Sequence, residues 1–176
     1  MAGRYEISTS RLVLLGADRA LLNADSAGRE ALAAASGAAV PASWPPDHHD
    51  HGVIGWVLSS LERIPPDAPW RFYYIVLSVP RTLIGTCGIK QPPGQDGCVE
   101  IGYSVLEQFR RRGLATEAAM ALIDAAFAAG ASEVAAETYP SLRPSIRVME
   151  KCGMAWTGEG SEPGTLRYRR QRAQER

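Results

Sequence analysis

Apolar and polar positions along the chain change period several times, and the order of these changes predicts a mixture of strands and helices. Runs rich in β-branched and aromatic residues predict strands at residues 12–15, 70–77, 82–89, 99–106 and 133–138. Helices are predicted at residues 18–35, 50–63, 113–129 and 144–151, and a closing pair of strands follows. These elements are those of a mixed α/β (α+β) protein.

Turn and cap residues mark the limits of these elements. Asp18 is the predicted N-cap of the first helix. The segment 40–47 is too rich in proline to be regular, and Pro65-Pro66 ends the second helix. A short link near Pro80-Arg81 predicts a hairpin. The pattern contains no repeat and no linker, so residues 1–176 are expected to form a single domain.

Composition narrows the range of partners. The chain has 176 residues, 45% of them hydrophobic, which is typical of a globular protein. Its 19 Lys+Arg balance 19 Asp+Glu, so net charge gives no reason to expect a nucleic acid or a membrane as partner. The basic segment 167–176 is interpreted as a solvated edge strand running into a tail, with nucleic-acid or acidic-partner binding as the alternative.

Cysteine usage and targeting signals suggest a compartment. Cys87, Cys98 and Cys152 are too few and too widely spaced for a disulfide framework or a zinc site. The N-terminus lacks a signal-peptide pattern, and no apolar run approaches the ~20 residues that span a bilayer. We therefore expect a cytoplasmic protein.

The segment between the 99–106 strand and the following helix carries the strongest chemical signal. Arg110-x-x-Gly113-x-Ala115 places small residues where a loop turns into a helix. Small residues let backbone N–H groups approach a ligand closely, and the first turn of a helix favours negative charge. The spacing is neither a Walker loop nor a dinucleotide fingerprint. An ordinary turn with a solvated arginine cluster is the alternative.

Three segments together resemble one family. Arg110-x-x-Gly113-x-Ala115 matches the Q/R-x-x-G-x-G/A signature of the GNAT superfamily of coenzyme A-dependent N-acetyltransferases. Residues 143–154 resemble the "pSirvlEklGF" segment of the branch that includes ribosomal-protein alanine N-acetyltransferases, and residues 7–14 resemble that branch's "TeRLvLr" start. The resemblance covers nearly the whole chain. It implies a GNAT fold, in which helices flank a twisted, mainly antiparallel central sheet.

The resemblance also implies a cofactor and the residues that hold it. Acetyl-CoA would be the acetyl donor, and no metal is required. Its pyrophosphate would lie on the backbone of the motif, and its pantetheine arm on amides of a strand that separates from its neighbour. The implied cofactor-binding residues are Tyr103, Ser104, Val105, Arg110, Arg111, Arg112, Gly113, Leu114, Ala115 and Thr116. For Tyr103, core packing is the alternative.

Acetyl transfer needs a neutral amine, so the resemblance directs attention to a base. Several family members place a glutamate on the central strand, where Glu100 stands here. The alternative is a solvated glutamate paired with a neighbour. Ser145 matches the serine of the alanine-acetyltransferase branch and is a candidate partner of the leaving thiolate, or else a helix N-cap.

The chain departs from the family at the usual general acid. Many GNAT enzymes have a tyrosine and an asparagine where this chain has Met149 and Leu142. Neither Met149 nor Leu142 can donate a proton, and Tyr139 is a second candidate acid. Because the usual tyrosine and asparagine are absent, the alternative to an enzyme is a non-catalytic module that binds acyl-CoA.

The sequence His48-His49-Asp50-His51 has the residue types of a metal site but not the spacing. Adjacent residues rarely face one metal ion, and no second ligand cluster follows. In the family, the link between the first two helices lines the acceptor pocket. Trp44, His48 and His49 are therefore candidate substrate-binding residues, with capping and packing as the alternative. The acceptor would be a primary amine of a protein N-terminus or a small molecule, and a homodimer is left open.

Overall fold

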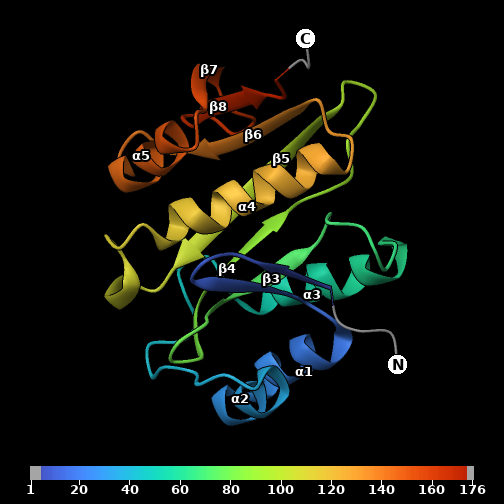
Figure 1. The fold of residues 1–176 in the computed structure, drawn as a ribbon, viewed down its shortest axis with the longest axis vertical. Coiled ribbons are helices and arrows are strands. Elements are labelled where there is room, and N and C mark those ends of the chain that lie inside the picture. The colour runs from blue at the N-terminus through green and yellow to red at the C-terminus, as the bar shows by residue number, and fades with distance from the viewer. Residues whose placement is uncertain (1–4, 174–176) are drawn as a thin grey trace.

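A computed structural model of the protein describes residues 5–173. Within them, an eight-stranded sheet has the order β1-β2-β3-β4-β5-β6-β8-β7 (Figure 1). The strands are β1 (Glu6–Ser8), β2 (Leu12–Gly16), β3 (Phe72–Leu77), β4 (Thr82–Ile89), β5 (Cys98–Val105), β6 (Glu133–Thr138), β7 (Ala155–Glu159) and β8 (Leu166–Gln171). Neighbours are antiparallel except for β5 and β6, which are parallel. The predicted mixed fold with a mainly antiparallel sheet is confirmed.

Helices cover the two faces of the sheet separately. One buried cluster joins the sheet to α4 (Leu114–Ala128) and α5 (Arg143–Lys151). A second cluster joins the opposite face to α1 (Arg19–Ala27), α2 (Arg29–Ser36) and α3 (His51–Ser60), which the short helix η1 (Leu61–Arg63) follows. Figure 1 shows α4 running along β5, and it shows α1 and α2 at the end of the molecule opposite β7 and β8. None of the helices between residues 5 and 173 has the length and apolarity to cross a bilayer.

Small side chains bring α4 close to the sheet. Ala118, Ala119 and Ala126 are fully buried, and Leu122 and Ile123 supply the bulk between them. Alanine favours a helix and leaves the backbone free to approach its neighbour. The packing holds the N-terminus of α4 beside the end of β5.

Two of the predicted elements differ in the structure. The expected helix at 18–35 is two helices, because Gly28 adopts φ 123, a conformation open to glycine and costly for other residues. Asp18 caps the first of them as predicted, accepting from Leu21 N–H at 2.8 Å. The predicted edge strand near residue 167 is wrong, since β8 lies between β6 and β7. Residues 174–176 of the basic tail lie outside the described residues, and β1 was not predicted.

The pairing of β5 changes along its length. On one side, β4 pairs with β5 continuously from Gly85↔Val105 to Ile89↔Ile101. On the other side, β6 pairs with β5 only from Cys98↔Glu133 to Glu100↔Ala135. Beyond that point β6 continues with β8 alone. The two parallel strands therefore separate after Glu100, as the family resemblance implies.

The close approach of β4 and β5 generates a test of the fold. A Cβ added at Gly85 would lie 2.2 Å from the carbonyl oxygen of Ser104, whereas one added at Gly102 would meet nothing within 4 Å. Gly85→Ala should therefore lower the free energy of unfolding by ~1–3 kcal/mol, while Gly102→Ala should change it by less than ~1 kcal/mol. Urea denaturation measures both. Equal effects would contradict the register of β4 against β5.

Candidate active site

The loop before α4 turns twice through left-handed backbone. After the short helix η2 (Glu107–Phe109), Arg111 has φ 62 and Gly113 has φ 76. A left-handed conformation is costly for arginine and persists only where its surroundings fix it. Alternation of hand along a loop turns successive N–H groups toward one concavity, which suits an anion.

The N-terminus of α4 continues this concavity. Gly113 is its N-cap, and no side chain of the described residues caps the helix. Leu114, Ala115 and Thr116 form the first turn, whose N–H groups have no partner within a helix. The helix dipole places positive charge at the same point. Loop and helix together can hold a phosphate group.

The three arginines of the loop are not equivalent. Arg110 is exposed but held by two contacts, because its Nε donates to the carbonyl of Val105 at 2.8 Å and its Nη2 pairs with Asp47 Oδ2 at 2.7 Å. Arg111 is exposed, and Arg112 is exposed with its guanidinium 5.9 Å from the centre of the Phe109 ring. Arg111 and Arg112 can add charge at the rim, whereas the guanidinium of Arg110 already binds the carbonyl at the end of β5 and Asp47.

Tyr103 lies on the separated part of β5 and reaches α5. Its hydroxyl donates to the carbonyl of Ser145 at 3.1 Å and lies 3.3 Å from Ser145 Oγ. Burial raises the pKa of Tyr103 to about 12, so the phenol is neutral and keeps its proton at neutral pH. The structure thus brings together two residues that the sequence placed in different roles.

Ser145 is inside α5 rather than at its cap. Leu142 occupies the N-cap position without a side-chain hydrogen bond, so the N-cap interpretation of Ser145 is wrong. The other positions considered for the acid lie elsewhere. Met149 is buried in the core, and Tyr139 is largely exposed with its hydroxyl 3.3 Å from Glu162 Oε2.

Glu100 lies on the opposite face of β5 from Tyr103. Alternation along the strand places Val99, Ile101 and Tyr103 toward α4 and α5, and Glu100 and Ser104 toward the other side. The Glu100 carboxylate forms an ion pair with Lys90, which extends from the end of β4. The Glu100 side chain is one-fifth exposed, so it is not sealed inside the core.

The link between α2 and α3 is anchored by a buried carboxylate. Asp25 accepts from Trp44 Nε1 at 2.8 Å and from the Tyr74 hydroxyl at 2.8 Å, and it pairs with His49 Nε2 at 2.6 Å. His49 also stacks on the Phe72 ring, with centroids 5.5 Å apart. Burial alone raises the pKa of Asp25, but the hydrogen bonds from His49 and Trp44 outweigh it and hold the pKa below its usual 3.8.

The three predicted substrate-binding residues therefore differ in access. Trp44 and His49 are at most 9% exposed, and Trp44 Nε1 and His49 Nε2 bond Asp25. His49 Nδ1 is buried without a hydrogen-bond partner among the described residues. His48, between the anchored residues, is exposed with φ 62. Asp50 caps α3 through Val53 N–H at 3.0 Å. Among the described residues no group of three His, Cys, Asp or Glu side chains could hold a metal ion.

Sequence analysis missed a contact between the N-terminal turn and α4. Glu117 Oε1 accepts from the Thr9 hydroxyl at 2.6 Å and from Arg11 N–H at 2.9 Å. Glu117 Oε2 accepts from Arg11 Nε at 2.7 Å, and Ser10 also donates to Oε1. The partners are more than 100 positions apart, so no local pattern relates them.

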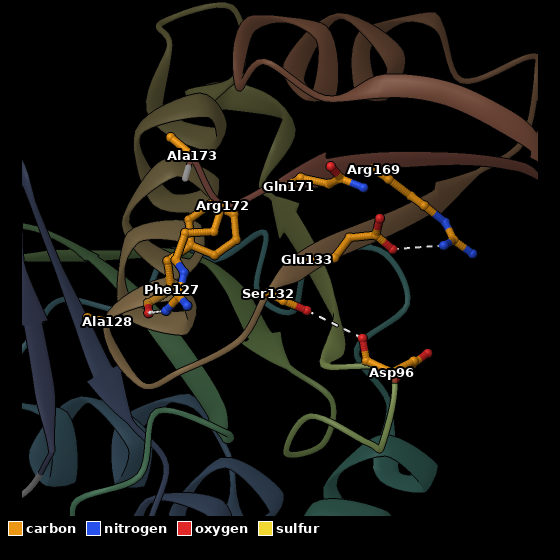
Figure 2. A pocket seen from close by; sticks show the side chains of 9 residues that line it. All are labelled: Asp96, Phe127, Ala128, Ser132, Glu133, Arg169, Gln171, Arg172 and Ala173. Carbon is orange, nitrogen blue, oxygen red and sulfur yellow. Dashed lines mark hydrogen bonds and ion pairs between the residues drawn. The ribbon is translucent and has the colours of Figure 1, made fainter. Parts of the chain in front are cut away.

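A hollow of about 1350 Å³ lies at the other end of α4 (Figure 2). Its charged side chains are already engaged: Glu133 pairs with Arg169 at 2.7 Å, and Arg172 donates to the carbonyl of Phe127 at 3.3 Å. The C-terminus of a helix carries the negative end of its dipole. This end of α4 is therefore unsuited to phosphate.

The Asp25 cluster generates a prediction about stability. Asp25→Asn should lower the free energy of unfolding by ~1.5–3 kcal/mol, because its buried donors lose a charged acceptor. Tyr74→Phe should cost ~0.5–1.5 kcal/mol alone and markedly less in the Asp25→Asn background. Urea denaturation of the two single variants and the double variant measures the coupling between Asp25 and Tyr74. If the two losses of stability simply added, Asp25 would not link α1 to β3.

Glu117 generates a prediction about pH. Burial raises the pKa of Glu117, but the hydrogen bonds from Thr9 and Arg11 outweigh it, so the folded pKa lies below the usual 4.5. The carboxylate therefore contributes stability that is complete above about pH 4.5 and is lost as the pH falls through the folded pKa. Glu117→Gln should be less stable than the native chain at pH 7, and the difference should shrink below about pH 4.5.

The matched control is Glu62→Gln, which removes an exposed ion pair with Arg19. It should change the free energy of unfolding by less than ~0.5 kcal/mol at either pH. Thermal unfolding followed by circular dichroism between pH 3 and pH 7 (about the range over which a carboxylate titrates) measures both variants. If the difference in stability between Glu117→Gln and the native chain did not change with pH over this range, the lowered folded pKa of Glu117 would be refuted.

Comparison with known proteins shows the family and the fold of the chain. A family model described as an acetyltransferase (GNAT) domain matches residues 19–155. An acetyltransferase from Agrobacterium tumefaciens str. C58 is 24% identical, with a TM-score of 0.69 over 97% of this chain and 96% of that one. A putative ribosomal-protein-serine acetyltransferase from Vibrio cholerae is 18% identical, with a TM-score of 0.70 over 98% and 100%.

A third similar structure contains a ligand. RimL, a ribosomal L7/L12 alpha-N-protein acetyltransferase solved in complex with coenzyme A, is 14% identical, with a TM-score of 0.65 over 95% of this chain and 98% of that one. No curated protein matches the chain by sequence. At these identities the solved structures show the fold alone, while the family model spans well over half of the residues. The chain belongs to the GNAT acetyltransferase family, and its structural neighbours include ribosomal-protein acetyltransferases.

Proposed function

We propose that this protein is an acetyl-CoA-dependent N-acetyltransferase that moves an acetyl group directly to a primary amine. One observation carries the proposal: the left-handed turn at Gly113 joins the separated part of β5 to the N-terminus of α4. A phosphate site and a row of strand amides are thus adjacent. The pyrophosphate and pantetheine of coenzyme A need this combination.

In the proposed complex, backbone amides from Arg111 to Thr116 hold the pyrophosphate. Arg111 and Arg112 add charge at the rim, and Arg110 keeps the end of β5 in place through Val105. The pantetheine arm lies between β5 and β6, where the two strands are no longer paired. A β5 amide near Val105 polarises the thioester carbonyl, as a backbone donor does in an oxyanion hole.

The two faces of β5 divide the reaction. The amine approaches on the Glu100 side, and its nitrogen attacks the acyl carbon while its proton passes to the glutamate. Pairing with Lys90 keeps the carboxylate in position but must be shared or exchanged when the amine binds. The carbon–sulfur bond then breaks, and the sulfur leaves as a thiolate on the other face, where Ser145 and Tyr103 meet and a hydroxyl can donate a hydrogen bond to it. The thiolate takes its proton from solvent, and Glu100 returns the proton of the amine to solvent. No covalent enzyme intermediate is needed.

A non-catalytic module that binds acyl-CoA is the second candidate. It is favoured by one observation: Met149, at the position of the usual acid, is buried in the core. Such a module would keep the cofactor site and make no use of Glu100.

The acceptor and the setting remain predictions. The acceptor is an amine of a protein N-terminus or of a small molecule, with Trp44, His48 and His49 near its pocket. The chain acts as one domain in the cytoplasm, without nucleic acid or membrane, and a homodimer is left open. The three free cysteines agree with a reducing compartment.

Calorimetric titration with acetyl-CoA tests the cofactor site. The native chain should bind with micromolar affinity, and Gly113→Glu should abolish binding because it adds strain and negative charge where the phosphates lie. Gly130→Glu is the matched control, since Gly130 also has positive φ but follows the other end of α4. Absence of binding to the folded native chain would refute the proposed function.

Glu100→Gln separates the two candidates. An enzyme should lose about a hundredfold in kcat with unchanged affinity for acetyl-CoA, whereas a binding module has no rate to lose. Thiol release measures the rate with an alanine-terminated peptide, spermidine and free lysine as acceptors. Glu133→Gln, which removes an ion-paired carboxylate from β6, should leave the rate unchanged.

A further inference from the structure

Arg11 lies beside the proposed phosphate site although it comes from the turn between β1 and β2. Its Nη1 donates to the carbonyl of Arg112 at 3.0 Å. Its Nε and Nη2 each lie 2.7 Å from Glu117 Oε2. All three guanidinium nitrogens are therefore engaged, and they connect the loop before α4 to the first turns of that helix.

The bond to Arg112 fixes more than one atom. The carbonyl of Arg112 and the N–H of Gly113 belong to the same planar peptide unit, on opposite sides of it. A donor that holds the carbonyl on one side therefore holds the N–H on the other. If this peptide turned over, a carbonyl oxygen would replace an N–H in the concavity and would repel a phosphate.

The peptide lies where such a turnover is easiest. It joins Arg112 to Gly113, whose φ of 76 shows that the chain here uses the freedom of glycine. Arg111, with φ 62, holds a conformation that its own side chain disfavours. Backbone of this kind needs an outside contact to keep one orientation.

The contact itself is held rigidly. Glu117 receives donors from Thr9, Ser10 and the backbone of Arg11 on one carboxylate oxygen, and the guanidinium on the other. Arg11 is about half exposed, so its ion pair alone contributes little stability. Arg11 instead fixes a geometry, because its planar guanidinium binds a carboxylate and a carbonyl at a fixed angle.

We propose that Arg11 is a positioning residue for the cofactor: it locks the Arg112–Gly113 peptide so that the Gly113 N–H faces the phosphates of coenzyme A. This inference rests on the proposed function. It assigns a role in cofactor binding to the N-terminal turn, about 100 positions before the motif that marks the site.

Titration with coenzyme A tests the assignment in two variants. Arg11→Gln removes the charge and the contact, and Arg11→Lys keeps the charge without the planar fork. Both should weaken binding about tenfold, the equivalent of one charge-assisted hydrogen bond. Arg19→Gln, which breaks an exposed ion pair with Glu62, should bind as the native chain does.

Two further variants separate the geometry of Arg11 from its charge and from the stability of the fold. In Arg11→Gln/Glu117→Gln the charges removed cancel, so recovery of native affinity would mean that charge alone mattered and would overturn the assignment. Ile54→Val, a mild change in the other core cluster, should lower the melting temperature without changing affinity. Arg11→Lys binding within about twofold of the native chain would also overturn the assignment. If the native chain itself does not bind coenzyme A, the proposed function is refuted, and the role of Arg11 is refuted with it.

Discussion

The separation of β5 from β6 after Glu100 is the constraint on which the candidate site depends. A strand that kept its parallel partner to the end would use its amides in the sheet and leave no space between the strands. Here β4 pairs with β5 continuously on one side, while on the other side the pairing with β6 ends at Glu100. After β5 come the short helix η2 and the left-handed turn at Gly113, and α4 begins at Leu114. Space, free strand amides and a helix N-terminus thus arise from one change of pairing.

The alternation of side chains along β5 gives this opening two chemically different sides. Glu100 and Ser104 face away from α4, and Tyr103 faces α5, where Ser145 is. An acid and a base on one face would pair with each other, as charged neighbours in a sheet do. Separation by the strand itself avoids that pairing. In the proposed mechanism the thioester lies between them, at the level of the backbone.

Features encoded by neighbouring residues were predictable from the sequence, and features encoded by distant ones were not. The Arg110-x-x-Gly113-x-Ala115 turn and the Asp18 cap are local, and the structure has the turn and the cap where expected. The break at Gly28 was missed because an alanine-rich stretch has high helix propensity on both sides of a single glycine. The place of β8 inside the sheet depends on strand order, which periodicity does not contain.

The same distinction holds within the candidate site. Trp44 and His49 were predicted at a pocket, but their partner Asp25 lies on another helix and no spacing relates it to them. Glu117 was visible as one acidic residue in a helix, and its partners lie at the start of the chain. Family resemblance predicted the motif that would bind the cofactor. It did not identify the side chains that hold this motif in shape.

The anchoring of Trp44 and His49 by one carboxylate has a consequence for how acceptor preference can change. Both ends of the short stretch between them are fixed to the body of the protein, so the residues in between form a loop of constant span. Substitution of exposed His48 alters the surface that this loop presents without removing the contacts of Asp25 with Trp44, His49 and Tyr74 on β3. If this loop lines the acceptor pocket, as the proposed function has it, a change of one exposed residue changes the amine that is accepted and leaves the anchor of the loop intact.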